Sequence, residues 1–203
     1  MEEAAPPRED EALVVTVPSI ETERLRLRGH RPEDLADCAA MLASPEVTRF
    51  IGGKPFSEEV VWTKLLRHIG HWSVMGFGFW VIEEKATGSF VGETGFVDFK
   101  RDIEPGLDGS PEIGWALVPS AQGKGFATEA ARAAITWQET HQAWPRTVCM
   151  IEPGNSASIR VAEKCGYREF ARTTYKDRPT ILLERARVAP APVREFPSPA
   201  TRS

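Results

Sequence analysis

The segment from Pro119 to Ala130 constrains the fold of this chain more than any other stretch. It contains Gly123 and Gly125, and it lies between an apolar stretch that predicts a strand and an alanine-rich stretch that predicts a helix. Its small residues leave backbone N–H groups uncovered at the positive end of the helix, a geometry that suits a diphosphate. No Gly-Lys-Ser or Gly-Lys-Thr is present, and the third glycine of a dinucleotide-binding fingerprint is missing. Taken alone, two glycines before a helix are equally compatible with a tight turn that binds nothing.

Around this segment, the chain predicts one α+β domain over residues 19–187. Its 203 residues are enough for one core plus extra chain. Periodic apolar residues predict helices over 33–42, 57–69, 127–141 and 155–164. Alternating and β-branched stretches predict strands over 22–28, 77–83, 89–100, 111–118, 147–151, 167–175 and 180–184. Because residues 84–88 have the composition of a hairpin turn, we expect a mixed, mostly antiparallel central sheet of six to seven strands, flanked by about four helices.

The composition of the two terminal segments predicts disordered tails. Residues 1–18 are acidic and contain proline, and residues 188–203 carry four prolines with little to bury. Proline removes backbone donors, and such segments gain too little apolar burial to offset the entropy of ordering.

Composition argues against several classes of partner. The net charge of −4 leaves no basic excess for nucleic acid. No apolar run approaches the roughly 20 residues that cross a bilayer, and the acidic residues 1–10 do not resemble a signal peptide. Cys38, Cys149 and Cys165 are too scattered for a disulfide framework or a zinc knuckle, which favours a reducing compartment. We therefore expect a cytoplasmic protein that binds neither nucleic acid nor membrane and holds no metal.

Two signatures, in the right order and separation, resemble the Gcn5-related N-acetyltransferase (GNAT) family. Gln122-x-x-Gly125-x-Ala127 is similar to motif A, and Asn155-x-x-Ser158 followed by residues 163–167 looks like motif B. Residues 21–25 resemble the opening strand of the ribosomal-protein (Rim-type) branch. The resemblance extends to about residue 185, hence over nearly the whole chain between the tails. It implies a single GNAT-type domain in which a splayed strand pair, starting at residues 111 and 147, forms the acetyl-CoA cleft.

The resemblance also implies that acetyl-CoA is the co-substrate and assigns residues to it. Backbone groups of Leu117 and Val118 would pair with the pantetheine arm. Asn155 would face the pantetheine, although an Asn at this position is more commonly a helix N-cap, and both roles can hold. The backbone amides that would bind the pyrophosphate belong to Gln122, Gly123, Lys124, Gly125, Phe126 and Ala127.

Acetyl transfer to an amine needs a base for the ammonium proton and benefits from an acid for the departing thiolate. Glu112 is the candidate base, since it stands in the same relation to motif A as the glutamate base of histone-type family members. The nearly equal alternative is that Glu112 is only a surface carboxylate of the strand. The base would then be a water chain or Glu93. The family's common tyrosine acid is replaced here by Ala162, so Ser158, one helical turn from Asn155, is the candidate donor.

Three further sets of residues could carry chemistry. Cys165 could accept an acyl group, but it ends a helix and has no histidine nearby in sequence, which favours an inert buried thiol. His68 and His71 lie on one helix face without a third metal ligand, so we expect surface histidines near the acceptor. Glu93 and Asp98 fall on opposite faces of a strand, so at most one of them belongs to the site.

Together these observations predict an N-acetyltransferase that acetylates a primary amine by direct attack in a ternary complex. The Rim-type resemblance suggests a protein N-terminus as acceptor, and a small-molecule amine is equally compatible. The alternative is a non-catalytic acyl-CoA-binding or regulatory module, which would keep the diphosphate cradle but need neither a base nor a path for the acceptor. A monomer and a homodimer are both compatible with the sequence.

Overall fold

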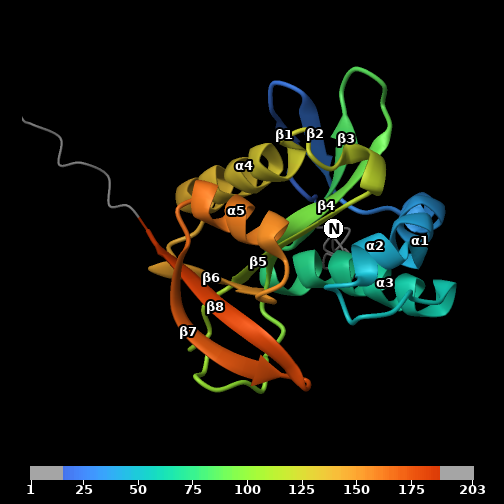
Figure 1. Ribbon diagram of the computed structural model, residues 1–203. Helices are drawn as coiled ribbons and strands as arrows, with labels where there is room; N and C mark the ends of the chain where they lie inside the picture. The colour runs from blue at the N-terminus through green and yellow to red at the C-terminus, as the bar shows by residue number, and fades with distance from the viewer. Residues whose placement is uncertain (1–15, 188–203) are drawn as a thin grey trace, which may run out of the picture.

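The computed structural model describes residues 16–187, which form an eight-stranded sheet with helices on both faces (Figure 1). The expected tails, 1–18 and 188–203, lie outside the described residues except for Thr16, Val17 and Pro18. Val17 packs against the core, and the carbonyl of Pro18 accepts a hydrogen bond of 2.8 Å from the indole of Trp80. Val17 and Pro18, which were predicted to belong to the tail, thus contact the folded domain.

The sheet is open and mixed, with the strand order β1-β2-β3-β4-β5-β6-β8-β7. Only β5 and β6 are parallel neighbours, so the expectation of a mostly antiparallel sheet is confirmed. The number of strands was underestimated, because the predicted strand 22–28 is preceded by a two-residue strand that folds back on it at Thr22. The strands are β1 (Ile20–Glu21), β2 (Leu25–Arg28), β3 (Phe79–Glu84), β4 (Phe90–Val97), β5 (Glu112–Leu117), β6 (Arg146–Ile151), β7 (Arg168–Tyr175) and β8 (Arg178–Ala186).

Five α-helices flank the sheet over residues 16–187, one more than expected. The additional helix is a single turn that begins at Pro45, a residue suited to the first position of a helix. The helix predicted over 57–69 runs on to Met75 and ends where Gly76 adopts a positive φ of 71°. The helices are α1 (Leu35–Ala43), α2 (Pro45–Thr48), α3 (Glu58–Met75), α4 (Phe126–His141) and α5 (Ser156–Lys164), with 3₁₀ turns at Pro32–Asp34 and Pro119–Ala121.

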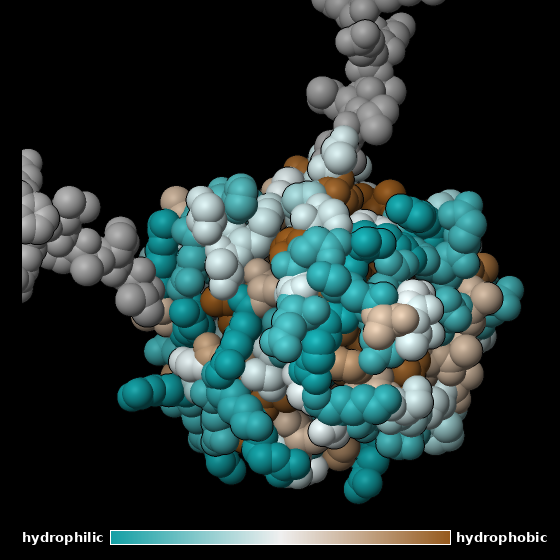
Figure 2. Space-filling view, turned by 90° about the horizontal axis from the view of Figure 1, so that it is seen from above, coloured by the Kyte–Doolittle hydropathy of each residue, from teal (hydrophilic) through white to brown (hydrophobic). Residues whose placement is uncertain are grey.

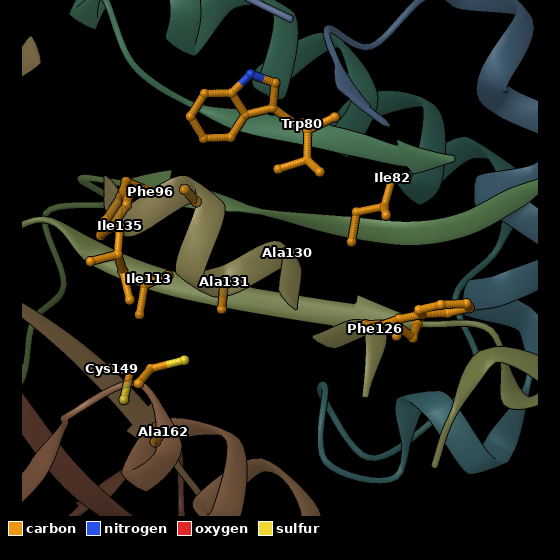
Figure 3. Packing of buried hydrophobic residues seen from close by; sticks show 14 of the residues in the cluster. Trp80, Ile82, Phe96, Ile113, Phe126, Ala130, Ala131, Ile135, Cys149 and Ala162 are labelled. Carbon is orange, nitrogen blue, oxygen red and sulfur yellow. The ribbon is translucent and has the colours of Figure 1, made fainter. Parts of the chain in front are cut away.

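The core occupies both faces of the sheet and fixes β4 and β5 between two layers. On one face, Ala130, Ala131 and Ile135 of α4 pack against Phe96 and Ile113 (Figure 3). Burying an Ile or Phe side chain contributes roughly 1.5–3 kcal/mol, so this layer supplies much of the stability. On the other face, α1, α2 and α3 cover a smaller cluster of Cys38, Met41, Leu42, Val47, Val61 and Ala116.

The surface seen in Figure 2 is mainly hydrophilic, and its hydrophobic residues form small separate areas. Among residues 16–187, the large hydrophobic side chains that stay exposed all belong to α3: Val60, Trp62, Leu66, Val74 and Met75. No helix in this part of the chain has the length and apolar character that crossing a bilayer requires.

Candidate active site

The sheet opens where β5 and β6 diverge. These parallel strands pair at one position, Glu112 with Val148, whereas β5 pairs with β4 along its whole length. The N–H of Val118 donates to the carbonyl of Val91 at 3.0 Å. Because the hydrogen bonds of an antiparallel pair alternate, Trp115 and Leu117 turn their backbone groups to the β6 side. The β6-facing edge of β5 therefore offers free backbone groups to an extended ligand.

The loop after β5 ends in an uncovered helix N-terminus. Gly125 is the N-cap of α4, with φ 82°, and no side chain caps the first turn. A Cβ at Gly123, whose φ is 74°, would meet no atom within 4 Å, so the loop is open beside it. The first N–H groups of a 16-residue helix thus point outward at its positive end, as diphosphate binding requires. Direct contacts of Gln122 to Ala127 with a ligand stay a prediction.

Arg24, just before β2, braces this loop from a distant part of the sequence. Its guanidinium donates to the carbonyl of Lys124 at 3.0 Å and forms an ion pair of 2.6 Å with Glu129 of α4. The same group lies 4.7 Å from the ring centre of Phe126. This role of Arg24 could not be predicted from the sequence, because nothing in a local pattern connects residues about 100 positions apart.

The two residues assigned to the pantetheine arm are placed differently. Leu117 faces the open edge, and its carbonyl accepts a long hydrogen bond of 3.4 Å from the side chain of Gln122. Both backbone groups of Val118 are engaged within the protein, the N–H with Val91 and the carbonyl with the N–H of Ala121. The geometry therefore favours Trp115 and Leu117, and not Val118, as the backbone partners of an extended arm.

The start of α5 lies against the open edge of β5. Asn155 is the N-cap, since its Oδ1 accepts from the N–H of Ser158 at 3.1 Å, and its amide nitrogen remains a potential donor. Oγ of Ser158 accepts a hydrogen bond of 3.3 Å from the indole of Trp115. This bond uses a lone pair of the hydroxyl and leaves its proton available, so Ser158 retains the capacity to donate.

A pocket of about 400 Å³ lies between α3 and the sheet and reaches the open edge at Trp115 and Ala116. Phe79 and Phe99 contribute apolar walls. Its volume is that of a small-molecule site. The ionisable side chains that line it are Lys64, Arg67, His68, Glu93, Arg101, Glu112, Glu152, Tyr175, Lys176 and Arg178.

Glu112, the predicted base, is held in a two-point ion pair. Its carboxylate oxygens accept from Nε and Nη2 of Arg101 at 2.5 and 2.8 Å, and Nη1 of Arg101 reaches the hydroxyl of Tyr175 at 3.2 Å. The partnership with Glu112 raises the pKa of Arg101 further above its usual range, despite the opposing effect of burial. Both oxygens of Glu112 are engaged, which argues against this carboxylate as the proton acceptor.

Glu93 is the carboxylate on the floor of the pocket, and it is only 6% exposed. One of its oxygens lies 3.5 Å from Nε2 of His30 and 3.9 Å from Nε2 of His68. Burial raises the pKa of Glu93, but the adjacent imidazoles and Lys64 outweigh it, and the pKa falls to about 2. Burial lowers the pKa of His68 to about 3, so this ring is neutral at neutral pH. Glu93 is therefore an ionised, poorly hydrated carboxylate opposite Ala116 of β5.

Comparison with known proteins identifies the family. Residues 24–168 match the family model described as the acetyltransferase (GNAT) domain. The chain belongs to the GNAT acetyltransferase family. It is 32% identical over 170 residues to the uncharacterized protein YkkB of Bacillus subtilis, covering 81% of this chain and 93% of that protein. It is 29% identical to the uncharacterized N-acetyltransferase p20 of Bacillus licheniformis, over 73% of this chain and 81% of that protein.

Solved structures agree on the GNAT fold. A putative GNAT-family acetyltransferase from Bordetella pertussis is 29% identical, with a TM-score of 0.74, and the match covers 83% of this chain and 99% of that chain. Three structures with coenzyme A are 16–20% identical with TM-scores of 0.67–0.69, over 80–83% of this chain and 95–98% of theirs. They are an aminoglycoside acetyltransferase, the ribosomal L7/L12 acetyltransferase RimL, and a spermidine N-acetyltransferase from Vibrio cholerae with spermine. At this identity they show the fold alone, so the Rim-type branch is not confirmed.

The other residues considered from the sequence differ in outcome. Cys165 is buried and burial raises its pKa, which agrees with an inert thiol. The prediction of surface histidines is wrong for His68, which is 3% exposed and stacks between His30 and Phe79. This burial could not be predicted from local spacing, because His30, which stacks on His68, is 38 positions away. Glu93 lines the pocket, whereas the Asp98 carboxylate pairs with Lys100 at 2.6 Å.

One group of residues in this GNAT domain could offer metal ligands. The ligand atoms of His30, Cys38 and Glu93 lie within 4.8 Å of one another. Ligand atoms around tetrahedral zinc lie about 3.3–3.8 Å apart, as follows from the usual bond lengths, so these would have to move closer. The expectation of no metal stays a prediction.

Proposed function

We propose that this GNAT protein transfers the acetyl group of acetyl-CoA to a primary amine by direct attack in a ternary complex. The observation that carries the proposal is one continuous path. It runs from the uncovered helix N-terminus at Gly125, along the open edge of β5, to the pocket that contains Glu93. A diphosphate, an amide-bearing arm and an acetyl group follow one another in acetyl-CoA in the same order. The fold's distant relatives that bind coenzyme A support this choice of co-substrate.

Glu93 is the proton acceptor in this proposal, in place of Glu112. An ammonium group with a pKa near 10 must lose its proton before it can attack a thioester. The Glu93 carboxylate is ionised and lies on the same face as Ala116, beside the open edge, whereas Glu112 is neutralised by Arg101. The proton passes to Glu93 directly or through a water between it and the two imidazoles.

Ser158 is the proposed partner of the leaving group. Its hydroxyl lies at the open edge, held by the indole of Trp115, and its proton can point toward the departing sulfur. A serine is a weak acid, so its contribution is a hydrogen bond to the developing thiolate. The acceptor class remains a primary amine, on a protein N-terminus or a small molecule.

The matched variants Glu93→Gln and Glu112→Gln test the proposal. Each keeps the shape of the side chain and removes a carboxylate. With a panel of amines and thiol release as readout, Glu93→Gln is expected to lower kcat by about 100-fold to 10,000-fold and leave the acetyl-CoA Kd unchanged. Glu112→Gln is expected to act mainly on KM, because it releases Arg101 into the pocket. A loss of kcat confined to Glu112→Gln would restore Glu112 as the base.

The same panel separates an enzyme from a non-catalytic module. A wild-type protein that binds acetyl-CoA and releases thiol with none of the amines would be an acyl-CoA-binding module. The uncovered helix N-terminus at Gly125 cannot by itself distinguish the two, since both need a diphosphate site.

A further inference from the structure

The charges in the pocket are unequal. Its lining contains five cationic side chains and three carboxylates. Two of the carboxylates are already paired, Glu112 with Arg101 and Glu152 with Arg178, the latter at 2.5 Å. The charged groups that remain are one carboxylate, Glu93, and three cations, which are Lys64, Arg67 and Lys176.

Lys64 and Arg67 lie on one face of α3, a helical turn apart, and no carboxylate of residues 16–187 comes within ion-pair distance of either. Their partners are aromatic rings: Nζ of Lys64 lies 5.5 Å from the centre of Phe56, and the guanidinium of Arg67 lies 4.3 Å from that of Phe99. Arg101 approaches the same Phe99 ring to 5.2 Å. Of these three cations, only Arg101 has a carboxylate partner, so Lys64 and Arg67 stay without an ionic partner in the described part of the chain.

This arrangement carries a cost in the empty pocket. Burial lowers the pKa of Lys64, and the nearby Arg67 and Arg101 lower it further, against the attraction of Glu93. Burial and Arg101 likewise lower the pKa of Arg67. An anion placed between Lys64 and Arg67 would remove the repulsion, and the planar guanidinium of Arg67 can bind a carboxylate or phosphate through two parallel hydrogen bonds.

We infer that the acceptor is a small amine that also carries an anionic group, a carboxylate or a phosphate, which binds Lys64 and Arg67 while its amine faces Glu93. This inference rests on the proposed function, whose pocket it describes. A polycationic acceptor would bring its extra ammonium groups against Lys64, Arg67 and Lys176. The charge of the pocket therefore disfavours polyamines and aminoglycosides for this chain.

Paired probes test the inference through binding and turnover. L-phenylalanine is compared with its amide and phosphoethanolamine with ethanolamine, so that each pair differs chiefly in the anion. In calorimetry with the full chain and bound coenzyme A, the member that carries the anionic group is expected to bind at least about tenfold more tightly than the member that lacks it. The pair that shows the larger ratio identifies carboxylate or phosphate as the natural group. Spermidine is the polycationic comparison.

Variants of Lys64 and Arg67 test whether these two cations cause the preference for the anionic probes. Lys64→Met and Arg67→Met are expected to reduce the preference about tenfold each, without weakening the binding of the probes that lack the anion. Lys54→Met, an exposed lysine outside the pocket lining, is the matched control. If spermidine binds better than the anionic probes, if neither anionic probe binds at about 10 mM, or if the variants leave the ratio unchanged, the inference is wrong. Preferential anion binding without any thiol release would instead uphold the inference and contradict the proposed catalysis.

Discussion

At the scale of single residues, the environment of each charged side chain determines what it can do. Glu93 and Glu112 are both carboxylates of one pocket, yet Arg101 neutralises Glu112, while the only ion-pair partners of Glu93 among the described residues are two imidazoles. The same contrast separates two arginines of the opening strand. Arg24 contacts Lys124 in the loop before α4 and two residues of α4, Phe126 and Glu129, whereas Arg26 forms an exposed pair with Glu21.

Replacing Arg24 is expected to weaken acetyl-CoA binding more than it weakens the fold. Arg24→Met removes the cationic partner of the Glu129 carboxylate, at the helix terminus where the diphosphate would lie, and like charges repel. We expect about a tenfold rise in Kd by calorimetry. The loss of stability should stay within about 1 kcal/mol, since the pair is partly exposed. Arg26→Met, two residues away, should change neither quantity, and equal effects of the two variants would contradict the bracing role.

His68 gives the protein a pH dependence with a defined sign. Its pKa in the folded state is about 3, below the ordinary value of about 6.5, so the unfolded chain binds the proton first. Stability is therefore fully present above about pH 6.5 and falls as the pH decreases toward 3, by up to about 1.4 kcal/mol per unit. Protonation of Glu93 lowers the stability only below about pH 4.3. Between pH 6.5 and 4.5 the change in stability therefore reports on His68 and not on Glu93. Denaturant unfolding of His68→Gln should lose this slope, whereas His141→Gln, on the exposed face of α4, should keep it.

At the scale of elements, local chemistry determined what the sequence could predict. Ser57 caps α3 as expected, and its side chain accepts from Val60; Gly76 and Gly166 follow helix ends with positive φ. The hairpin of β3 and β4 follows from alternation and a glycine turn. Two contacts could not be predicted, because they depend on strand register and helix rotation rather than on local spacing. They are the ion pair of Arg101 with Glu112 and the approach of Glu93 to His30 and His68.

The segment before β1 is expected to be part of the folded unit. The indole of Trp80 is fully buried and donates to the Pro18 carbonyl, and Val17 packs against the core. A chain that begins at residue 19 loses this acceptor, and an unsatisfied buried donor costs roughly 1–3 kcal/mol. Its melting temperature should therefore lie several degrees below that of a chain that begins at residue 16. Equal melting temperatures would place the boundary back at residue 18.

At the scale of the whole molecule, the divergence of β5 and β6 divides the sheet. β1–β5 lie on one side, covered by α4, and β6–β8 lie on the other, joined to β5 at one register position (Figure 1). The proposed acetyl-CoA site lies along this division, with Leu117 on one side and Asn155 on the other. A ligand that fills the gap adds contacts to both parts in the folded state only.

Acetyl-CoA is therefore expected to stabilise the protein as a whole. A ligand that binds only the folded state contributes RT ln(1 + [L]/Kd), about 2.7 kcal/mol at 100 times Kd, which corresponds to a rise of roughly 5–10 °C in melting temperature for a domain of this size. Gly125→Asp should abolish the rise, because it places a side chain at φ 82° and a negative charge against the diphosphate. Glu112→Gln, distant from the α4 loop, serves as the control and should retain it. Binding of unchanged affinity by a folded Gly125→Asp protein would show that the helix N-terminus is not the diphosphate site.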